Sequence, residues 1–360
     1  MVFKFCPLSI LAFIAVLSNH LTHGHGQPET EDEIKHYLDS QRSIYHCYPE
    51  ILHQVEQRKL DFLRASSAGQ LPSWVDQSIP SKLETLQFGS PSSSESDLHS
   101  DHPPSLESTP SRLICSQNHS HSSPKFDQIR NSTCVLSPVV RAGPYYHREG
   151  HPIRQTLSEW QEGLPLSLNI GVIDVETCKP VQGALVDLWH ANATGFYSGH
   201  PNRAIGFEQE KPQVGGTRAG LLHTFPRTRF EEQWLRGAWP TDKHGVARFN
   251  TIFPGYYTGR ATHIHAEVHM DWETTSNGTF RSKDVQYIGQ FFFDDEINMK
   301  VDRMWPYWQN PVEHRTRNWR DSLKVFQESR SGGFHPVLDI MKIGTVINQG
   351  LIGFITERRA

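Results

Sequence analysis

Two histidines, His263 and His265, lie two positions apart within residues 262–270, a segment whose composition predicts a β-strand. Side chains alternate across a strand, so both imidazoles leave the same face with their rings close together. One strand can offer two nitrogen ligands to a single metal ion in this way. An isolated His-x-His pair binds a metal about as often as it consists of one core histidine and one surface histidine. The other candidate ligands are therefore needed to distinguish the two cases.

Tyrosines near these histidines indicate which metal such a site would hold. Tyr197 ends the segment that begins at Trp189, and Tyr256 and Tyr257 shortly precede the histidines. Phenolate oxygen is a hard ligand and imidazole a borderline one, and ferric iron accepts both. The alternative for each tyrosine is a packing residue with a satisfied hydroxyl, which is common in strands.

Glu267 and His269 extend the polar face of the same strand beyond His265. Four polar groups on one buried face need a reason to be there, which favours a metal site. A second hypothesis is therefore a zinc or cupin-like enzyme that uses the histidines and Glu267. The spacing of the histidines and Glu267 does not fit the cupin pattern. A zinc site would also leave the tyrosines without a role. A third hypothesis is a secreted β-sandwich module that binds an aromatic or carbohydrate ligand without chemistry.

The chain has 360 residues and a formal net charge of −4, with no block of lysine and arginine. This composition gives no basis for nucleic-acid binding. Lys4 precedes an apolar run over residues 5–17, which is too short for a membrane span of about 20 residues but typical of a signal peptide. We therefore expect residues 1–24 to be removed and the mature chain to be secreted, with no membrane span.

Of the five cysteines, Cys6 would leave with the signal peptide. The even number that remains predicts two disulfides in a secreted chain, with three alternative pairings. These cysteines are Cys47, Cys115, Cys134 and Cys178. Sequons, typical of a secreted glycoprotein, begin at Asn118, Asn131, Asn192 and Asn277. The sequon at Asn192 lies within the segment that ends at Tyr197 and is not expected to carry a glycan.

The chain divides into parts of different composition. Residues 25–65 have helical periodicity, which Pro49 is expected to divide into two helices. Residues 66–130 are rich in serine and proline and predict a flexible insert, whereas residues 131–360 have the pattern of a β-domain. Strands are expected at 166–175, 184–190, 246–252, 262–270, 285–293 and 345–357, with a helix near 319–328. Many short strands predict an antiparallel sandwich or barrel.

Five segments, in this order, resemble the intradiol ring-cleavage dioxygenases, and in particular their secreted, single-chain branch. They are Gly143–Tyr146, Trp189–Tyr197, Pro254–Tyr257, Arg260–His265 and Gly289–Asp294. The resemblance extends over roughly residues 134–358. It implies a mainly β fold, an antiparallel β-sandwich of the intradiol dioxygenase type, here with an N-terminal helical segment.

The resemblance also implies roles for individual residues. The ligands of a non-haem Fe(III) would be Tyr197, Tyr257, His263 and His265. Tyr257 would also take a proton from the substrate, while Arg260 and Gln290 would act in catalysis. Gly143, Pro144 and Tyr145 would line the mouth of the substrate site, and Tyr256 would either contact substrate or pack.

The implied reaction is oxidative cleavage of a catechol between its two hydroxyl-bearing carbons, with dioxygen as co-substrate and a muconate-type product. The partners are accordingly a small catechol or other phenolic compound and O2. Which catechol it takes remains open, because pocket size depends on loops such as the long stretch between Tyr197 and Leu235. A monomer is favoured over an oligomer.

Overall fold

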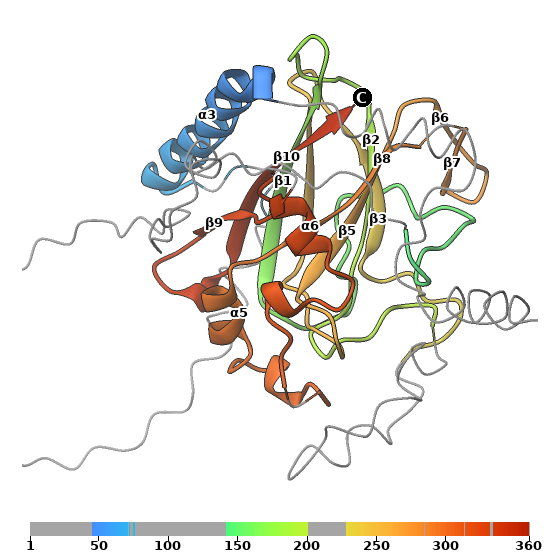
Figure 1. The fold of residues 1–360 in the computed structure, drawn as a ribbon, viewed down its shortest axis with the longest axis vertical. Coiled ribbons are helices and arrows are strands. Elements are labelled where there is room, and N and C mark those ends of the chain that lie inside the picture. Colours follow the sequence, from blue (N-terminus) through green and yellow to red (C-terminus); the bar gives the residue numbers. More distant parts are fainter. Residues whose placement is uncertain are drawn as a thin grey trace, which may run out of the picture.

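The computed structural model describes residues 45–70, 72, 75, 142–200, 228–283, 285–312, 314–331 and 334–359. Two four-stranded sheets form the body of this part of the chain (Figure 1). The first has the order β4-β1-β10-β9 and consists of β1 (Pro165–Asp174), β4 (Val246–Ile252), β9 (Asp339–Lys342) and β10 (Leu351–Arg359). The second has the order β3-β2-β5-β8 and consists of β2 (Leu185–Trp189), β3 (Arg236–Pro240), β5 (His263–His269) and β8 (Val285–Phe292).

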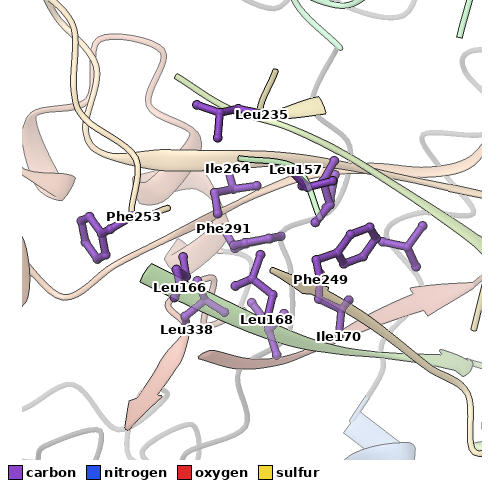
Figure 2. Packing of buried hydrophobic residues seen from close by; sticks show 14 of the residues in the cluster. Leu157, Leu166, Leu168, Ile170, Leu235, Phe249, Phe253, Ile264, Phe291 and Leu338 are labelled. Carbon is purple, nitrogen blue, oxygen red and sulfur yellow. The ribbon is translucent and has the colours of Figure 1, made fainter. Parts of the chain in front are cut away.

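The largest apolar cluster lies between the two sheets, which confirms the predicted sandwich. Leu166, Leu168 and Ile170 alternate along β1 and point at the second sheet (Figure 2). Ile264 on β5 and Phe291 on β8 meet them from the other side. Period-two alternation therefore sends one face of β5 into this core and leaves its other face for the polar residues.

The sheets differ from the purely antiparallel arrangement that was predicted. β1 and β10 pair in parallel, with Leu166 opposite Leu351, so the first sheet is mixed. These strands come from opposite ends of the β-domain, and no local turn constrains their direction as it does in a hairpin. The second sheet is antiparallel throughout, and that is the sheet that carries the histidines.

Helix α3 (Tyr48–Ser67) confirms the N-terminal helical segment, and the expected division at Pro49 concerns residues on its N-terminal side that lie outside the described residues. Pro49 lies in the first turn, where its missing N–H would have no helical partner, so it begins the helix. The helix buries Ile51, Val55 and Phe62 against the first sheet, which Figure 1 shows beside it. Residues 25–44 and nearly all of the 66–130 segment fall outside the described residues.

A disulfide joins Cys47, directly before α3, to Cys178 in the turn that follows β1. This disulfide belongs to one of the three alternative pairings that the sequence left open. Cys115 and Cys134 lie outside the described residues. Arg58 fastens the helix further, because its guanidinium donates to Asn169 Oδ1 and Thr356 Oγ1, both at 2.9 Å.

The remaining elements lie around this sandwich. Strands β3 and β9 were not predicted, nor was the small hairpin of β6 (Trp272–Thr274) and β7 (Phe280–Ser282). The predicted helix near 319–328 is replaced by a short 3-10 turn, Asn318–Arg320, and helix α6 (Val325–Ser331). Helix α5 (Asp295–Val301) follows β8, and further 3-10 turns lie at Tyr45–Cys47, Tyr307–Gln309 and Ile347–Gln349. Within the described ranges, no helix has the length and apolar character that crossing a bilayer requires.

Candidate metal centre

The outward face of β5 carries the predicted histidine pair. Ile264, Ala266 and Val268 point into the sandwich core, so His263 and His265 point away from it. Their Nε2 atoms lie 3.1 Å apart, and both side chains are almost completely buried. The pair therefore forms the two-nitrogen arrangement that the spacing predicted.

Tyr197 reaches the histidines from the chain that follows β2. Asn192 shapes this approach, because its Oδ1 accepts hydrogen bonds from the backbone N–H groups of Thr194 and Phe196. A side chain of Asn that accepts from the backbone two residues on stabilises a tight turn. The turn places Tyr197 Oη 3.5 Å from His263 Nε2. Asn192 is thus occupied in the turn, as its position in the sequence suggested.

Tyr257 approaches the same atom from the loop that leads into β5. Its Oη lies 3.4 Å from His263 Nε2, so two phenol oxygens and His265 Nε2 all lie within 3.1–3.5 Å of one imidazole nitrogen. Ligand atoms that bind one metal at about 2.0–2.2 Å have separations of this size. Two phenol oxygens with two imidazole nitrogens form a donor set that suits ferric iron. The residues present therefore fit the metal that the sequence predicted.

Neighbouring groups orient both imidazoles. His263 Nδ1 lies 2.6 Å from the carbonyl oxygen of Ala261, which fixes Nδ1 as the donor and leaves the lone pair of Nε2 for a metal. Trp189 stacks on His265 with ring centroids 4.8 Å apart and an interplanar angle of 9°. Trp189 is thus a positioning residue for the site.

The electrostatic environment keeps the side chains neutral before a metal binds. Burial raises the pKa of Tyr197 well above its ordinary value, and the neighbouring Tyr257 adds to this effect. Burial also raises the pKa of Tyr257, although Arg260 opposes the shift. The pKa of His263 is lowered well below its usual range by burial and by Arg260. Iron binding must therefore displace protons from both phenols.

Arg260, which was predicted to act in catalysis, is fixed beside the hydroxyl oxygen of Tyr257. Its Nη1 donates to Tyr257 Oη at 3.1 Å, and its Nη2 donates to Gln290 Oε1 at 2.5 Å. Its Nε donates to both carboxylate oxygens of Asp321, at 3.0 and 3.2 Å. The predicted residues Arg260 and Gln290 thus form one hydrogen-bonded unit with a ligand residue.

The segment Gly143–Tyr145 borders the site, as predicted. Tyr145 stacks on Tyr197 with centroids 4.3 Å apart and meets Tyr257 edge-on at 6.0 Å. Gly143 has a φ of 80°, and a Cβ at this position would lie 3.9 Å from the ring of His265. Gly143 and Pro144 are exposed, so this segment lies at an edge that a substrate can reach.

Tyr256 has the contacts of a packing residue, one of the two roles that the sequence left open for it. Its hydroxyl donates to the carbonyl oxygen of Val312 at 2.9 Å, and the guanidinium of Arg315 lies over its ring at 4.3 Å. The side chain is buried in these contacts. We therefore assign Tyr256 to packing, because its neighbour Tyr257 already occupies the direction toward the histidines.

Two buried charged residues near the site were missed in the sequence. Asp321 holds Arg260, and Arg236 donates to the carbonyl oxygen of Tyr145 at 2.6 Å and to that of Ser198 at 2.8 Å. Arg236 thereby ties the Tyr145 segment to the residue that follows Tyr197. Neither residue lies in a recognisable motif, and only their burial marks them as unusual.

A family model described as "Dioxygenase" matches residues 141–223. The match contains Gly143–Tyr146 and Tyr197 but ends before Tyr257 and the histidines. The predicted resemblance, and with it the prediction of a dioxygenase among the oxidoreductases, is confirmed at the level of this family model. A comparison with curated proteins gave no match.

Several solved structures are similar to this chain. An intradiol ring-cleavage dioxygenase from Tetranychus urticae is 28% identical, with 63% of this chain and 95% of that chain covered and a TM-score of 0.47. The dioxygenase domain of a carbohydrate-binding fusion protein from Streptomyces sp. SirexAA-E is 21% identical, with 62% and 97% covered and a TM-score of 0.37. Catechol 1,2-dioxygenase from Pseudomonas arvilla C-1 is 18% identical, with 99% and 87% covered and a TM-score of 0.37.

Proposed function

We propose that this protein is a secreted, non-haem Fe(III) intradiol dioxygenase that uses O2 to cleave a catechol ring between its two hydroxyl-bearing carbons. The product would be a muconate-type dicarboxylic acid. One observation carries the proposal: Tyr197, Tyr257 and His265 converge on His263 Nε2 within 3.1–3.5 Å. An iron site would use all four of these side chains. A zinc site made of the histidines alone would leave both tyrosine oxygens without a role.

Bound ferric iron would supply the Lewis acidity that holds a catechol through its oxygens and activates its ring. The chain's own contribution begins with Tyr257. A catechol that binds through both oxygens must lose its protons, and the Oη of Tyr257 can accept one of them. Tyr257 suits this role better than Tyr197 because it is partly exposed, whereas Tyr197 is 4% exposed.

Arg260 supports the same step electrostatically. Its Nη1, 3.1 Å from Tyr257 Oη, stabilises a phenolate at that oxygen and any negative charge that develops on the substrate beside it. A guanidinium held at fixed distance in a buried setting acts more strongly than one in water. Gln290 and Asp321 hold Arg260 so that its direction does not change during the reaction.

The side chains around the ligands also shape the substrate site. Tyr145 covers the ring of Tyr197, and Gly143 leaves room beside His265 where a larger side chain would crowd it. The Nε2 of Gln290 is buried and has no hydrogen-bond acceptor among the described residues. This amide is therefore available to donate to a substrate oxygen.

Secretion is part of the proposal. It is supported by the apolar run at residues 5–17 and by the Cys47–Cys178 disulfide, because disulfides persist in oxidising compartments. Asn277 lies exposed in the turn between β6 and β7, where a glycan could be attached. Expression in a eukaryotic secretory host, followed by N-terminal sequencing of the protein in the medium, tests this part. A start near residue 24 is expected, and an intact Met1 in a cell-retained product would contradict it.

The test of the activity is a visible spectrum of the purified protein, before and after catechol is added without oxygen. We expect a tyrosinate-to-iron charge-transfer band that shifts when catechol binds, followed by O2 uptake and a muconate-type product when air is admitted. A protein that stays colourless after iron is supplied would refute the proposal. Turnover in a colourless zinc-loaded protein would indicate a zinc enzyme, and ligand binding without turnover would indicate a binding module.

A further inference from the structure

The outward face of β5 carries a second group of ligand-type side chains beyond the histidine pair. Glu267 and His269 follow His265 on this face, and Asp187 of β2 lies directly across from Glu267 in the antiparallel register. All three of Asp187, Glu267 and His269 are at most 2% exposed. The proposed iron site uses none of them.

Their ligand atoms come together at one point. One carboxylate oxygen each from Asp187 and Glu267 and one ring nitrogen of His269 all lie within 4.8 Å of one another. Glu267 Oε2 lies 3.4 Å from His269 Nε2. Two ligands of one cation, each at about 2.0–2.2 Å, lie at most about 4.4 Å apart, so a small adjustment of these side chains would let them share one ion.

The hydroxyl of Tyr146 interacts with both carboxylates of this cluster, and part of the cluster is left without hydrogen bonds. Among the described residues, neither ring nitrogen of His269 has a hydrogen-bond partner, and neither does Asp187 Oδ2. A buried imidazole in this state is costly, because Nδ1 has lost water without replacement and Nε2 has only the 3.4 Å contact with Glu267 Oε2. His269 is aimed at the two carboxylates, so a cation between them would satisfy it.

The neighbouring groups fix the hydrogen bond that Asp187 accepts. Arg236 Nη1 lies 3.3 Å from His151 Nε2, and since an arginine can only donate, this nitrogen is the acceptor. His151 Nδ1 therefore carries the proton and donates to Asp187 Oδ1 at 2.7 Å. A neutral histidine that donates to one carboxylate oxygen leaves the other oxygen, Oδ2, to bind a cation.

A path for the ion also exists. A cavity of about 530 Å³ is lined by His269, Tyr146, Thr275 and Thr279 among others, so solvent can reach the edge of the cluster. Three protein ligands would leave a fourth position for water from this cavity.

We propose that Asp187, Glu267 and His269 form a second metal site, which binds a divalent cation of the zinc class. Two carboxylates and one imidazole are ligands that Zn²⁺ accepts, and the ion would join β2 to β5 on the face that also presents the iron ligands. The site is independent of the proposed function, because the two ligand sets share no residue.

The experiment measures metal content in the iron-loaded, full mature protein. The protein is dialysed against zinc, passed through a desalting column, and analysed for both metals by mass spectrometry while the visible band reports on iron. We expect one equivalent of zinc in addition to iron, with the band unchanged. His269→Gln should lose this zinc and keep the iron, as should Glu267→Gln, and circular dichroism confirms that each variant is folded.

His244→Gln is the matched control, because His244 is exposed in the turn between β3 and β4. It should retain the full equivalent of zinc. Uptake of zinc that matches a loss of iron, or equal zinc in wild type and in folded His269→Gln, would overturn the proposal, as would no zinc uptake at all. If the protein proves to bind no iron, zinc that remains in His263→Gln but is lost in His269→Gln still supports the second site.

Discussion

The carboxylate of Asp321 holds both Arg260 and the residue Ala261, whose carbonyl group orients His263. Its Oδ2 accepts from Arg260 Nε at 3.0 Å and from the N–H of Ala261 at 2.9 Å. The carbonyl of Ala261 in turn contacts His263 Nδ1 at 2.6 Å. One carboxylate, directly after the 3-10 turn Asn318–Arg320, therefore fixes the position of the guanidinium and of a predicted metal ligand together.

Asp321→Asn is therefore expected to lower kcat about 10²-fold while it leaves the iron band in place. The amide keeps the shape of the carboxylate but loses its charge, and misplacement of a positioned group by about 1 Å costs an effect of this size. KM for catechol and kcat are measured separately, with Asp242→Asn, which removes a carboxylate paired with Arg248, as the control. Equal kcat in Asp321→Asn and wild type would contradict the role given to Asp321.

Tyrosine-to-phenylalanine substitutions should separate the two phenol ligands. Tyr257→Phe removes the phenol that contacts Arg260 and is placed to take a proton, so turnover should fall by about 10²–10⁴-fold. The iron band should shift but persist, since Tyr197 remains. Tyr256→Phe is the neighbouring control and should keep nearly full activity, because its hydroxyl donates to the carbonyl oxygen of Val312. Loss of activity in Tyr256→Phe alone would reverse the assignment.

The sequence predicted that His263 and His265 share one face of a strand, because their spacing follows strand geometry. A His-x-His pair in a strand must share a face, and the neighbouring apolar residues Ile264 and Ala266 determine that this face points away from the core. Most strands in the β-domain were found from alternation and turn residues for the same reason. Short edge elements such as β6 and β9 have too few residues for a period to be visible.

Long-range pairings could not be predicted in the same way. The parallel pairing of β1 with β10 and the hydrogen bonds of Asp321 join segments far apart in the chain, and no local pattern encodes them. Pro49 illustrates a different limit. The sequence indicates that proline is disfavoured inside a helix, but only the fold shows that Pro49 lies in the first turn of α3.

Removal of the Cys47–Cys178 disulfide should weaken the attachment of α3 to the sandwich. The bond closes a loop with a sequence separation of 131 residues, and its loss in the Cys47→Ser, Cys178→Ser double variant should lower the free energy of unfolding by about 2–5 kcal/mol. Arg58 still binds Asn169 and Thr356, so the helix should remain docked and the iron band unchanged. Denaturant titration measures the difference, and Thr177→Ser in the same turn is the control. An unchanged midpoint and slope would contradict a stabilising role.

Glu357 on β10 should make the protein less stable as the pH rises. It is fully buried, neither carboxylate oxygen has a hydrogen-bond partner among the described residues, and burial raises its pKa to about 8. Its pKa in the unfolded chain is about 4.3, so between these values the folded state holds a proton that the unfolded state has released. Stability from this residue is present below about pH 4.3 and is lost as the pH rises toward 8, by up to about 1.4 kcal/mol per pH unit.

Glu357→Gln cannot ionise, so it should match wild type near pH 4.5 and unfold at a higher denaturant concentration at pH 8. Glu273→Gln, which changes an exposed carboxylate on β6, should follow wild type at both pH values. A Glu357→Gln curve that runs parallel to wild type across this range would show that Glu357 is ionised in the folded protein.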